Sequence, residues 1–294
     1  MEYLDRNEFN YNPAPAVIET VKNFDIKKLC FYTRIYDEGK KSILSVFISE
    51  QYGIDESQVV LGYGGEDILK QTIHYFLSMT NGNKTILVPK FSWWYYKSIA
   101  DEVNGVTIQY PLYEKDNTFV YDIPSLKTML YECKPKVLLM ASPNNPTGNA
   151  LSPNEIDEIL QFVPSDCIII IDEAYASFVI QDKTYIKYLI NKYPNLIIIR
   201  TLSKFYGLPG LRMGFSFVGK NFTNFTSYIN KYLGYNRFAE DVAIAALKSE
   251  DYYREVAKNM DEGRTLFTKE IGKLPGFKVY LKFAANPFAR TNLI

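Results

Sequence analysis

The stretch Ile168-Ile169-Ile170-Ile171-Asp172-Glu173-Ala174-Tyr175 carries four consecutive β-branched residues followed by two carboxylates. A run that is apolar throughout, with no alternation of polar side chains, is typical of a strand buried on both faces of a parallel sheet. Other runs share this character, and segments with helical periodicity separate them. This pattern predicts an α/β fold with a mostly parallel central sheet and helices on both faces. The other runs cover residues 85–88, 106–110, 137–141 and 196–201, and the helical segments cover 66–79, 94–103, 123–132, 153–162 and 240–260.

The composition is balanced, because the 294 residues include 33 basic and 33 acidic side chains and the formal net charge is 0. Such a chain has no global field to attract a polyanion, so we expect neither nucleic acid nor a membrane surface as a partner. The longest apolar runs have the length of a strand and are too short to span a bilayer. The first residues show no signal-peptide pattern, and the three scattered cysteines suit a reducing compartment, so the sequence predicts a cytoplasmic protein.

Polar clusters follow the ends of several apolar runs, at residues 62–67, 142–148, 172–175 and 201–212. In an open parallel sheet, ligands bind in the crevice at the carboxyl ends of the strands. The coincidence of these clusters therefore predicts one binding site at that edge. Taken alone, the loop at 142–148 has the composition of an ordinary turn held by asparagine side chains.

A glycine-rich turn formed by Gly62, Gly64 and Gly65 precedes the helix that is expected to begin near Glu66. The free N–H groups at such a helix start can hold an anion, which makes the turn a candidate phosphate cradle. A plain connection between strand and helix explains the glycines about equally well. The turn is neither a Walker loop nor a GxGxxG dinucleotide motif.

Asp172 and Glu173 stand at the end of the predicted strand, where a buried carboxylate needs a cationic or protonated partner. A magnesium site is the usual alternative for such a pair. We predict no metal site, because no further carboxylate or histidine cluster stands nearby in the sequence. The single histidine, His74, lies in the middle of a predicted helix and is expected to be structural.

The segment after residues 196–201 places Thr201, Ser203 and Lys204 at a strand end, followed by Arg212. These side chains combine an amine nucleophile with a candidate phosphate site. A lysine in a desolvated, cation-rich crevice has a lowered pKa, and its neutral amine can form a Schiff base with an aldehyde. A single lysine without this context would be expected to be a solvated surface residue.

Three motifs occur in one order along the chain: NNPTG at 144–148, DEAY at 172–175 and TLSKFYGLPGLRMGF at 201–215. In this order and spacing the sequence resembles the fold type I pyridoxal phosphate enzymes, specifically the class I/II aminotransferases of the histidinol-phosphate aminotransferase-like group. The resemblance extends from LDRNEFNY at 4–11 to about residue 285. It implies pyridoxal 5′-phosphate as the cofactor and small-molecule amino donors and acceptors as substrates.

The resemblance assigns the chemistry to a few residues. It implies that Lys204 holds the cofactor as an internal aldimine and then shuttles a proton at the substrate α-carbon. Asp172 would pair with the pyridine nitrogen and keep it protonated. Asn145 and Tyr175 would hydrogen-bond the 3′ oxygen of the ring, and Asn145 is also expected beside the substrate.

The resemblance also implies how the cofactor is held. Backbone N–H groups of Gly65 and Glu66 would bind the phosphate, together with the side chains of Thr201, Ser203 and Arg212, of which Arg212 would be the main counter-charge. Phe91 falls where the family has an aromatic side chain stacked on the ring. The alternative for Phe91 is a packed core aromatic.

The segments at 7–11 and 34–37 resemble family segments that reach across a homodimer. The resemblance therefore implies a homodimer with shared active sites, in which Tyr36 contacts the neighbour's cofactor phosphate and Tyr11 its substrate. Aromatic packing of either tyrosine is the alternative. Ile35 departs from the family pattern.

We expect three regions: an N-terminal arm at 1–32 that belongs to a small domain, a large cofactor-binding domain at 33–270, and the start of a C-terminal small domain at 271–294. A strand is expected at 274–279. Compared with the family, the chain is expected to be truncated, without the late arginine that grips the substrate, and Arg290 matches no family position.

The leading hypothesis is an aminotransferase that moves an amino group from glutamate to a keto or aldehyde acceptor, possibly phosphorylated. Two alternatives stay open: a decarboxylase of an O-phosphoamino acid with the same cofactor residues, and an inactive cofactor-binding remnant. An aminotransferase and a decarboxylase differ in which bond at the substrate α-carbon lies perpendicular to the cofactor ring. The motifs do not specify that bond.

Overall fold

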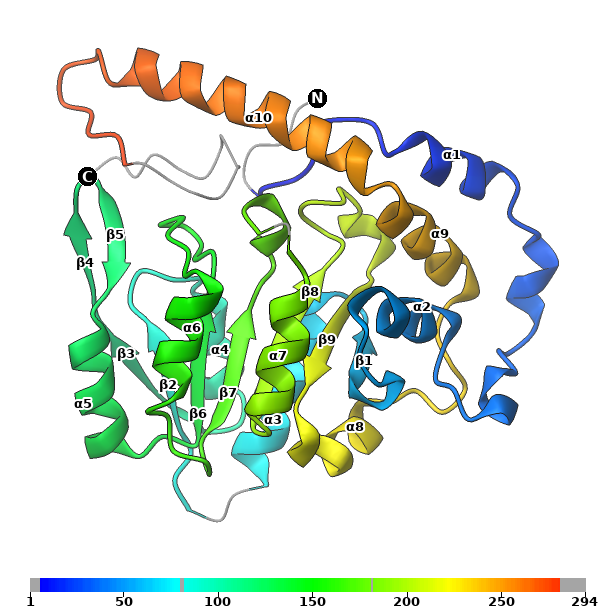
Figure 1. Cartoon of the computed structure of the whole chain (residues 1–294), viewed down its shortest axis with the longest axis horizontal. Helices are drawn as coiled ribbons and strands as arrows, with labels where there is room; N and C mark the ends of the chain where they lie inside the picture. Colours follow the sequence, from blue (N-terminus) through cyan, green and yellow to red (C-terminus); the bar gives the residue numbers. More distant parts are fainter. Residues whose placement is uncertain (1–5, 80–81, 181, 281–294) are drawn as a thin grey trace.

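A seven-stranded sheet forms the centre of the protein (Figure 1). The computed structural model describes residues 6–79, 82–180 and 182–280. The strand order is β1-β9-β8-β7-β6-β2-β3, in which β3, β2, β6, β7 and β8 pair in parallel and β9 is antiparallel to both β8 and β1. The predicted α/β fold with a mostly parallel sheet is confirmed. The strands are β1 (Val59–Gly62), β2 (Thr85–Pro89), β3 (Val106–Tyr110), β6 (Val137–Ala141), β7 (Ile168–Asp172), β8 (Leu196–Thr201) and β9 (Gly214–Val218).

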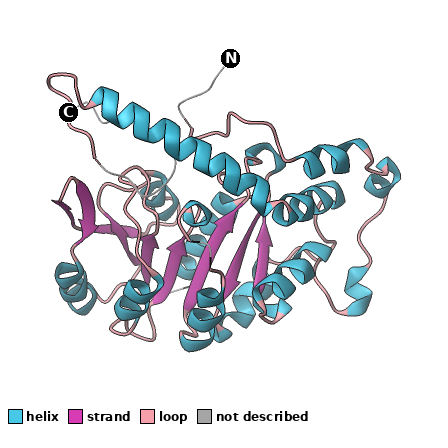
Figure 2. Cartoon of the chain, turned by 45° about the horizontal axis from the view of Figure 1, so that its top comes forward, coloured by secondary structure: helices cyan, strands magenta, loops and turns pink. Residues whose placement is uncertain are grey.

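Helices cover both faces of this sheet, as Figure 2 shows. Helices α3, α4 and α8 pack on one face, and α2, α5, α6, α7 and α9 supply the buried apolar residues of the other face. The helices are α1 (Pro15–Lys22), α2 (Ile43–Tyr52), α3 (Gly65–Ser78), α4 (Tyr95–Asp101), α5 (Ile123–Cys133), α6 (Pro153–Leu160), α7 (Thr184–Lys192), α8 (Thr223–Ile229), α9 (Arg237–Lys248) and α10 (Glu250–Ile271). Among the described residues, none of the helices has the length and apolar character needed to cross a bilayer.

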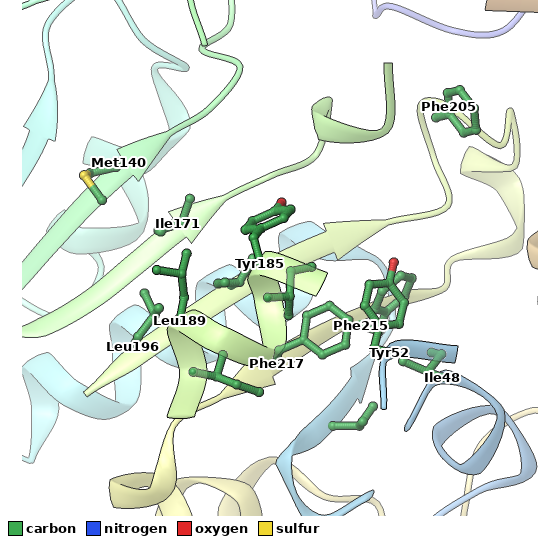
Figure 3. Close-up of a cluster of buried hydrophobic side chains, with 14 of the residues drawn as sticks. Ile48, Tyr52, Met140, Ile171, Tyr185, Leu189, Leu196, Phe205, Phe215 and Phe217 are labelled. Atoms are coloured by element: carbon green, nitrogen blue, oxygen red, sulfur yellow. The ribbon is translucent and has the colours of Figure 1, made fainter. Parts of the chain in front are cut away.

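The central strands contribute alternate side chains to the two cores. Ile169 and Ile171 of β7 pack in the core beneath α6 and α7, whereas Ile170 packs in the core beneath α3. Figure 3 shows Ile171 beside Leu189 and Leu196 in the first of these cores. Each of these isoleucines is at most 1% exposed, and such burial stabilises the fold by about 1.5–3 kcal/mol per side chain. The isoleucine run is therefore a strand covered on both faces.

Local signals set several helix boundaries. Ser152 accepts a hydrogen bond from the N–H of Glu155, and the Glu155 side chain bonds back to the Ser152 N–H, so α6 begins with a capping box and Pro153. The helix expected at 240–260 is wrong as a single element, because α9 ends at Lys248 and α10 begins at Glu250. The break at Ser249 lets α10 leave the sheet and place Tyr253 in the core.

The N-terminal arm lies outside the sheet, as predicted, and its helix α1 packs on α9 (Figure 1). A two-stranded hairpin, β4 (Leu112–Lys115) and β5 (Thr118–Tyr121), stands beside the sheet. The strand predicted at 274–279 is wrong, because residues 272–280 form turns and irregular backbone. Arg290 and the rest of 281–294 lie outside the described residues.

Candidate active site

The strand register brings the predicted polar clusters to one edge of the sheet. Asp172, the last residue of β7, pairs with Ala141 at the end of β6 and with Ile199 of β8. Thr201 at the end of β8 pairs with Gly214 at the start of β9, and Gly214 also pairs with Gly62 at the end of β1. The carboxyl ends of β1, β6, β7 and β8 therefore meet at the edge where ligands bind in such sheets.

The glycine turn forms a close-packed cradle at the start of α3. Gly64 is the N-cap with a φ of 90°, and it provides no side-chain bond to the first turn of the helix. A Cβ at Gly64 would lie 2.9 Å from Nη2 of Arg212, and a Cβ at Gly65 would lie 3.2 Å from the Cβ of Thr201. Only glycine fits both positions without displacing its neighbours. The uncapped N–H groups and the positive helix end suit an anion such as a phosphate.

Arg212 lies against the same helix start. Its guanidinium donates to the carbonyl oxygen of Tyr63 at 3.2 Å and lies 3.8 Å from the Glu66 carboxylate. Because both side chains of this ion pair are half exposed, the pair itself adds little stability, and the guanidinium, held by the carbonyl oxygens of Tyr63 and Pro209, stays accessible to an incoming anion. Arg212 thus stands where the sequence places the phosphate counter-charge.

The hydroxyl groups of Thr201 and Ser203 lie on the other side of the cradle. Their oxygen atoms are 2.9 Å apart, and the Ser203 N–H donates to Oγ1 of Thr201 at 3.1 Å. This turn follows β8 directly and packs the Thr201 side chain against Gly65, with the Ser203 hydroxyl bonded to that of Thr201. The structure therefore brings together the five residues that the sequence assigned to phosphate binding: Gly65, Glu66, Thr201, Ser203 and Arg212.

Asp172 is enclosed by donors that favour its ionised form. Burial raises the pKa of Asp172, whereas the Tyr96 hydroxyl, the N–H of Ala174 and the charge of Lys204 act in the opposite direction. Oδ2 accepts from the Tyr96 hydroxyl at 2.8 Å, and Oδ1 accepts from the Ala174 N–H at 3.0 Å. Sequence reasoning missed Tyr96, because nothing in the run Trp93-Trp94-Tyr95-Tyr96 distinguishes it from an ordinary core aromatic.

Lys204 is largely buried, and desolvation lowers the pKa of its amine. The negative charges of Glu8 and Asp172 oppose this shift, whereas the positive charge of Arg212 adds to it. The Nζ atom donates to the carbonyl oxygen of Arg6 at 2.8 Å and lies 5.8 Å from the centre of the Tyr175 ring. Burial therefore makes this amine easier to deprotonate than an exposed lysine, and the neutral amine is the form that attacks an aldehyde.

The N-terminal arm reaches the site of its own chain. The Asn7 side-chain amide donates to the hydroxyl of Tyr175 at 2.9 Å, and burial raises the pKa of Tyr175 to about 12. The Phe9 ring packs so closely on Gly207 that a Cβ there would lie 2.4 Å from it. The ring centre of Tyr11 lies 5.6 Å from that of Phe9, with the two rings tilted by 56°, and Tyr11 is 43% exposed. Sequence reasoning did not anticipate the contacts of Arg6 and Asn7, which join segments far apart in the chain.

Phe91 and Asn145 stand on loops that are tied together. Phe91 has a φ of 54° and is 51% exposed, so it is not a packed core aromatic. Its carbonyl oxygen accepts from the side chain of Asn144 at 3.0 Å, and Asn144 also donates to Thr147 at 2.6 Å. Asn144 therefore holds the loop as predicted for a turn-forming asparagine, and it leaves the half-buried Asn145 available for a ligand.

The remaining predicted residues have other surroundings. Glu173 forms a buried ion pair with Arg200 at 2.9 Å, so of the two adjacent acids only Asp172 belongs to the site. His74 of α3 has its Nε2 atom 3.1 Å from the Glu102 carboxylate, which supports a structural role. Tyr36 falls in a short helix (Ile35–Glu38), and its side chain lies outside the described residues. Within 6–79, 82–180 and 182–280, no cluster of three metal-ligating side chains is found.

Comparison with known proteins finds one family model and relatives with a common name. Residues 2–285 match the family model of aminotransferase class I and II. The histidinol-phosphate aminotransferase 2 of Carboxydothermus hydrogenoformans is 31% identical over 97% of this chain and 75% of its own length. The histidinol-phosphate aminotransferase 2 of Haemophilus influenzae strain 86-028NP is also 31% identical, over 85% of this chain and 66% of its own length.

Solved structures share the fold. Histidinol-phosphate aminotransferase from Sinorhizobium meliloti, in complex with pyridoxal-5′-phosphate, superposes with a TM-score of 0.81 at 21% identity, over 95% of this chain and 72% of that one. L-threonine-O-3-phosphate decarboxylase from Porphyromonas gingivalis superposes with a TM-score of 0.72 at 18% identity. The superposition covers 92% of this chain and 76% of the decarboxylase chain. At these identities the likeness concerns the fold alone.

The chain therefore belongs to the class I and II aminotransferases. It is a pyridoxal-phosphate-dependent enzyme of histidinol-phosphate aminotransferase-like type, as the sequence motifs predicted. The residues fit this cofactor: the cradle at Gly64 and Gly65 suits its phosphate, Lys204 offers a desolvated amine for its aldehyde, and Asp172 offers a carboxylate for its ring.

Proposed function

We propose that this enzyme transfers an amino group from glutamate to a keto or aldehyde acceptor that carries a phosphate. The observation that carries the proposal is the joint burial of the Lys204 amine and the Asp172 carboxylate beside the anion cradle of α3. Bound pyridoxal phosphate supplies an aldehyde that condenses with amines and a ring that withdraws electrons from the α-carbon of the substrate.

The cofactor-binding roles follow from where the side chains stand. The N–H groups of Gly65 and Glu66, the hydroxyls of Thr201 and Ser203 and the Arg212 guanidinium hold the phosphate. The amide of Asn145 and the hydroxyl of Tyr175 bind the 3′ oxygen of the ring, and Phe91 covers a ring face. Asp172 pairs with the ring nitrogen. Each group is a donor or acceptor of the kind that its proposed partner requires.

Lys204 is the covalent anchor of the cofactor and the base of the reaction. With substrate and cofactor bound, its amine would take a proton from the substrate α-carbon and deliver it to the C4′ position of the cofactor. The lowered pKa of Lys204 supports this role, because a base must be unprotonated at the pH at which it works. The Tyr175 ring, 5.8 Å from Nζ, limits the directions in which the amine can move.

We also propose how the enzyme assembles and where it is located. The enzyme works as a homodimer in the cytoplasm, with Tyr36 near the partner's phosphate, whereas Tyr11 lies on the arm that reaches Lys204 and Tyr175 of its own chain. Its large domain covers 33–270, and 1–32 with 271–294 belong to a small domain.

The names of the relatives suggest the substrate. Several of the most similar curated proteins are histidinol-phosphate aminotransferases, and the identity to two of them reaches 31%. Histidinol phosphate, the compound in their name, carries the phosphate group that we propose for the substrate. We therefore propose histidinol phosphate as the amino compound on the acceptor side of the reaction.

The experiment measures glutamate formation from histidinol phosphate and 2-oxoglutarate with the full chain and added pyridoxal phosphate. Turnover with histidinol phosphate, and a much lower rate with unphosphorylated histidinol, would support the proposal. A Lys204→Ala variant is the control for non-enzymatic transfer. Carbon dioxide release from an O-phosphoamino acid without glutamate formation would contradict it and favour a decarboxylase. Absence of both activities with cofactor bound would favour an inactive remnant.

A further inference from the structure

Tyr96 reaches Asp172 from helix α4, which packs on one face of the sheet. It lies in the first turn of α4, is 3% exposed and packs among the buried residues of the core that includes Ile99 and Ala100. The edge of its ring meets Trp93 at 5.6 Å. Helix α4 follows β2, and two strand pairings, β2 with β6 and β6 with β7, separate that strand from Asp172. The packing thus carries a hydroxyl to a carboxylate 76 residues away in sequence.

Within the part of the chain that the structure describes, each oxygen of Asp172 accepts one hydrogen bond. The Ala174 N–H, two residues along the chain, bonds Oδ1 at 3.0 Å, which any aspartate at this turn can accept. The Tyr96 hydroxyl bonds Oδ2 at 2.8 Å and is the only one of the two that depends on a distant side chain. One donor for each oxygen fixes the plane of the carboxylate and leaves lone pairs free on both atoms.

We infer that Tyr96 is a positioning residue for Asp172, whose hydroxyl keeps the carboxylate ionised and correctly oriented so that the shared proton resides on the cofactor's ring nitrogen. The inference rests on the proposed pairing of Asp172 with that nitrogen. A hydrogen bond donated to a carboxylate stabilises its anion relative to the neutral acid, so without it the proton of the pair shifts toward Asp172.

Tyr96 remains a donor throughout the working range of pH. Burial and the negative charge of Asp172 both raise the pKa of Tyr96 well above its ordinary value. Asp172 also interacts electrostatically with three other titratable groups. They are Lys204 from the turn after β8, Tyr121 from β5 and Tyr175 from the turn after β7. Among the hydrogen bonds of the described residues, Tyr96 is the side chain that bonds the carboxylate directly.

The matched control is Tyr110, which is also a deeply buried tyrosine. Its hydroxyl donates to the carbonyl oxygen of Leu139 at 3.1 Å and has no bond to Asp172. Tyr96→Phe and Tyr110→Phe therefore each remove one buried hydroxyl and its hydrogen bond. Only the first removes a donor from the carboxylate.

The first measurement titrates the ¹³C-labelled Asp172 carboxyl in the full chain without cofactor. In Tyr96→Phe the midpoint is expected to rise by about one pH unit, since a hydrogen bond to a charged group contributes about that much. In Tyr110→Phe it is expected to stay at the wild-type value. Equal midpoints in wild type and Tyr96→Phe would overturn the inference.

The second measurement follows the ring nitrogen of ¹⁵N-labelled pyridoxal phosphate bound to the full chain. The wild type and Tyr110→Phe are expected to show a protonated ring, and Tyr96→Phe is expected to shift toward the unprotonated value. An unprotonated ring in the wild type would contradict the proposed pairing of Asp172 itself. A protonated ring in wild type and Tyr96→Phe alike would leave that pairing intact and overturn the role of Tyr96.

A third measurement needs no change at Tyr96 and applies if Tyr96→Phe fails to fold. In the wild-type chain with ¹³Cζ-labelled tyrosine, the Tyr96 signal is expected to shift with the same midpoint as the Asp172 carboxyl. This shift is expected to disappear in Asp172→Asn. A Tyr96 signal that ignores the titration of Asp172 would overturn the inference.

Discussion

Gly214 lies so close to Gly64 that a Cβ on Gly214 would stand 2.5 Å from the Gly64 carbonyl carbon and from the nitrogen of Gly65. The first residue of β9 therefore supports the turn that starts α3. Because these neighbours are backbone atoms, no side-chain rotation could relieve the contact. The anion cradle and the antiparallel edge of the sheet are thus one packed unit.

Gly214→Ala is expected to displace this turn and to weaken cofactor binding. Overpacking of this kind costs about 1–3 kcal/mol, which urea unfolding would measure as a lower free energy of unfolding. Gly210→Ala is the matched control, since a Cβ at Gly210 has no neighbour within 4 Å. If the two variants bind pyridoxal phosphate with equal affinity, the cradle does not depend on the contact between Gly214 and Gly64.

The buried pair of Glu173 and Arg200 is expected to stabilise the fold without acting in the reaction. Arg200 Nη2 lies 2.9 Å from the Glu173 carboxylate, and the hydroxyls of Tyr185 and Tyr52 complete the network. Glu173→Gln leaves an uncompensated buried charge, so the free energy of unfolding should fall by about 3–5 kcal/mol.

The control for this variant is Glu270→Gln, which breaks an exposed pair with Lys273. That change should lower the free energy of unfolding by less than about 1 kcal/mol. Urea unfolding of both variants checks the prediction. Equal losses of stability in the two variants would show that the Glu173 network is not a special contributor.

Glu240 gives the stability a specific pH dependence. Its carboxylate accepts a hydrogen bond from Ser42, and burial raises the pKa of Glu240 from 4.5 to about 7. Below pH 4.5 the group is protonated in both states. As the pH rises toward 7 the unfolded chain ionises first, so the contribution of Glu240 to the free energy of unfolding falls, by roughly 3 kcal/mol in all. Above pH 7 it stays level.

Glu240→Gln removes this group from the titration. The free energy of unfolding of the wild type, relative to the variant, should therefore fall between pH 5 and pH 8. Urea unfolding at these two pH values measures the difference, and Glu262→Gln on the exposed side of α10 serves as the control. A wild-type to variant difference that is the same at both pH values would contradict the prediction.

Asp172→Asn should retain bound cofactor but lose activity. The amide keeps the shape of the side chain and still accepts from the Ala174 N–H, yet it has no charge to hold a proton on the ring nitrogen. Loss of one preorganised electrostatic group lowers kcat by about a hundredfold or more. Steady-state kinetics of the cofactor-saturated variant test this, and a kcat equal to that of the wild type would remove Asp172 from the mechanism.

The sequence predicted those features that local patterns encode. The isoleucine run placed Asp172 at a strand end, and the glycines before α3 placed the cradle, because both depend on neighbours within a few residues. The contacts of Tyr96 with Asp172 and of Arg6 with Lys204 could not be predicted. Each joins segments at least 76 residues apart, which only the packing of α4 and of the arm brings together.

The missed or wrong elements have a similar cause. The break between α9 and α10 depends on where Tyr253 packs against Phe9 and Tyr206, and helical periodicity continues through Ser249 without a sign of it. Strand β9 pairs antiparallel with both of its neighbours, and nothing in its own five residues specifies that direction.

We propose that Lys204 is the residue that binds the cofactor covalently. Borohydride reduction of the full chain with pyridoxal phosphate, followed by peptide mass spectrometry, tests it most directly. The desolvated amine beside Asp172 predicts one stable adduct on Lys204, and none there after Lys204→Arg. An adduct confined to another lysine, or no adduct at all on a folded wild-type chain, would contradict the account.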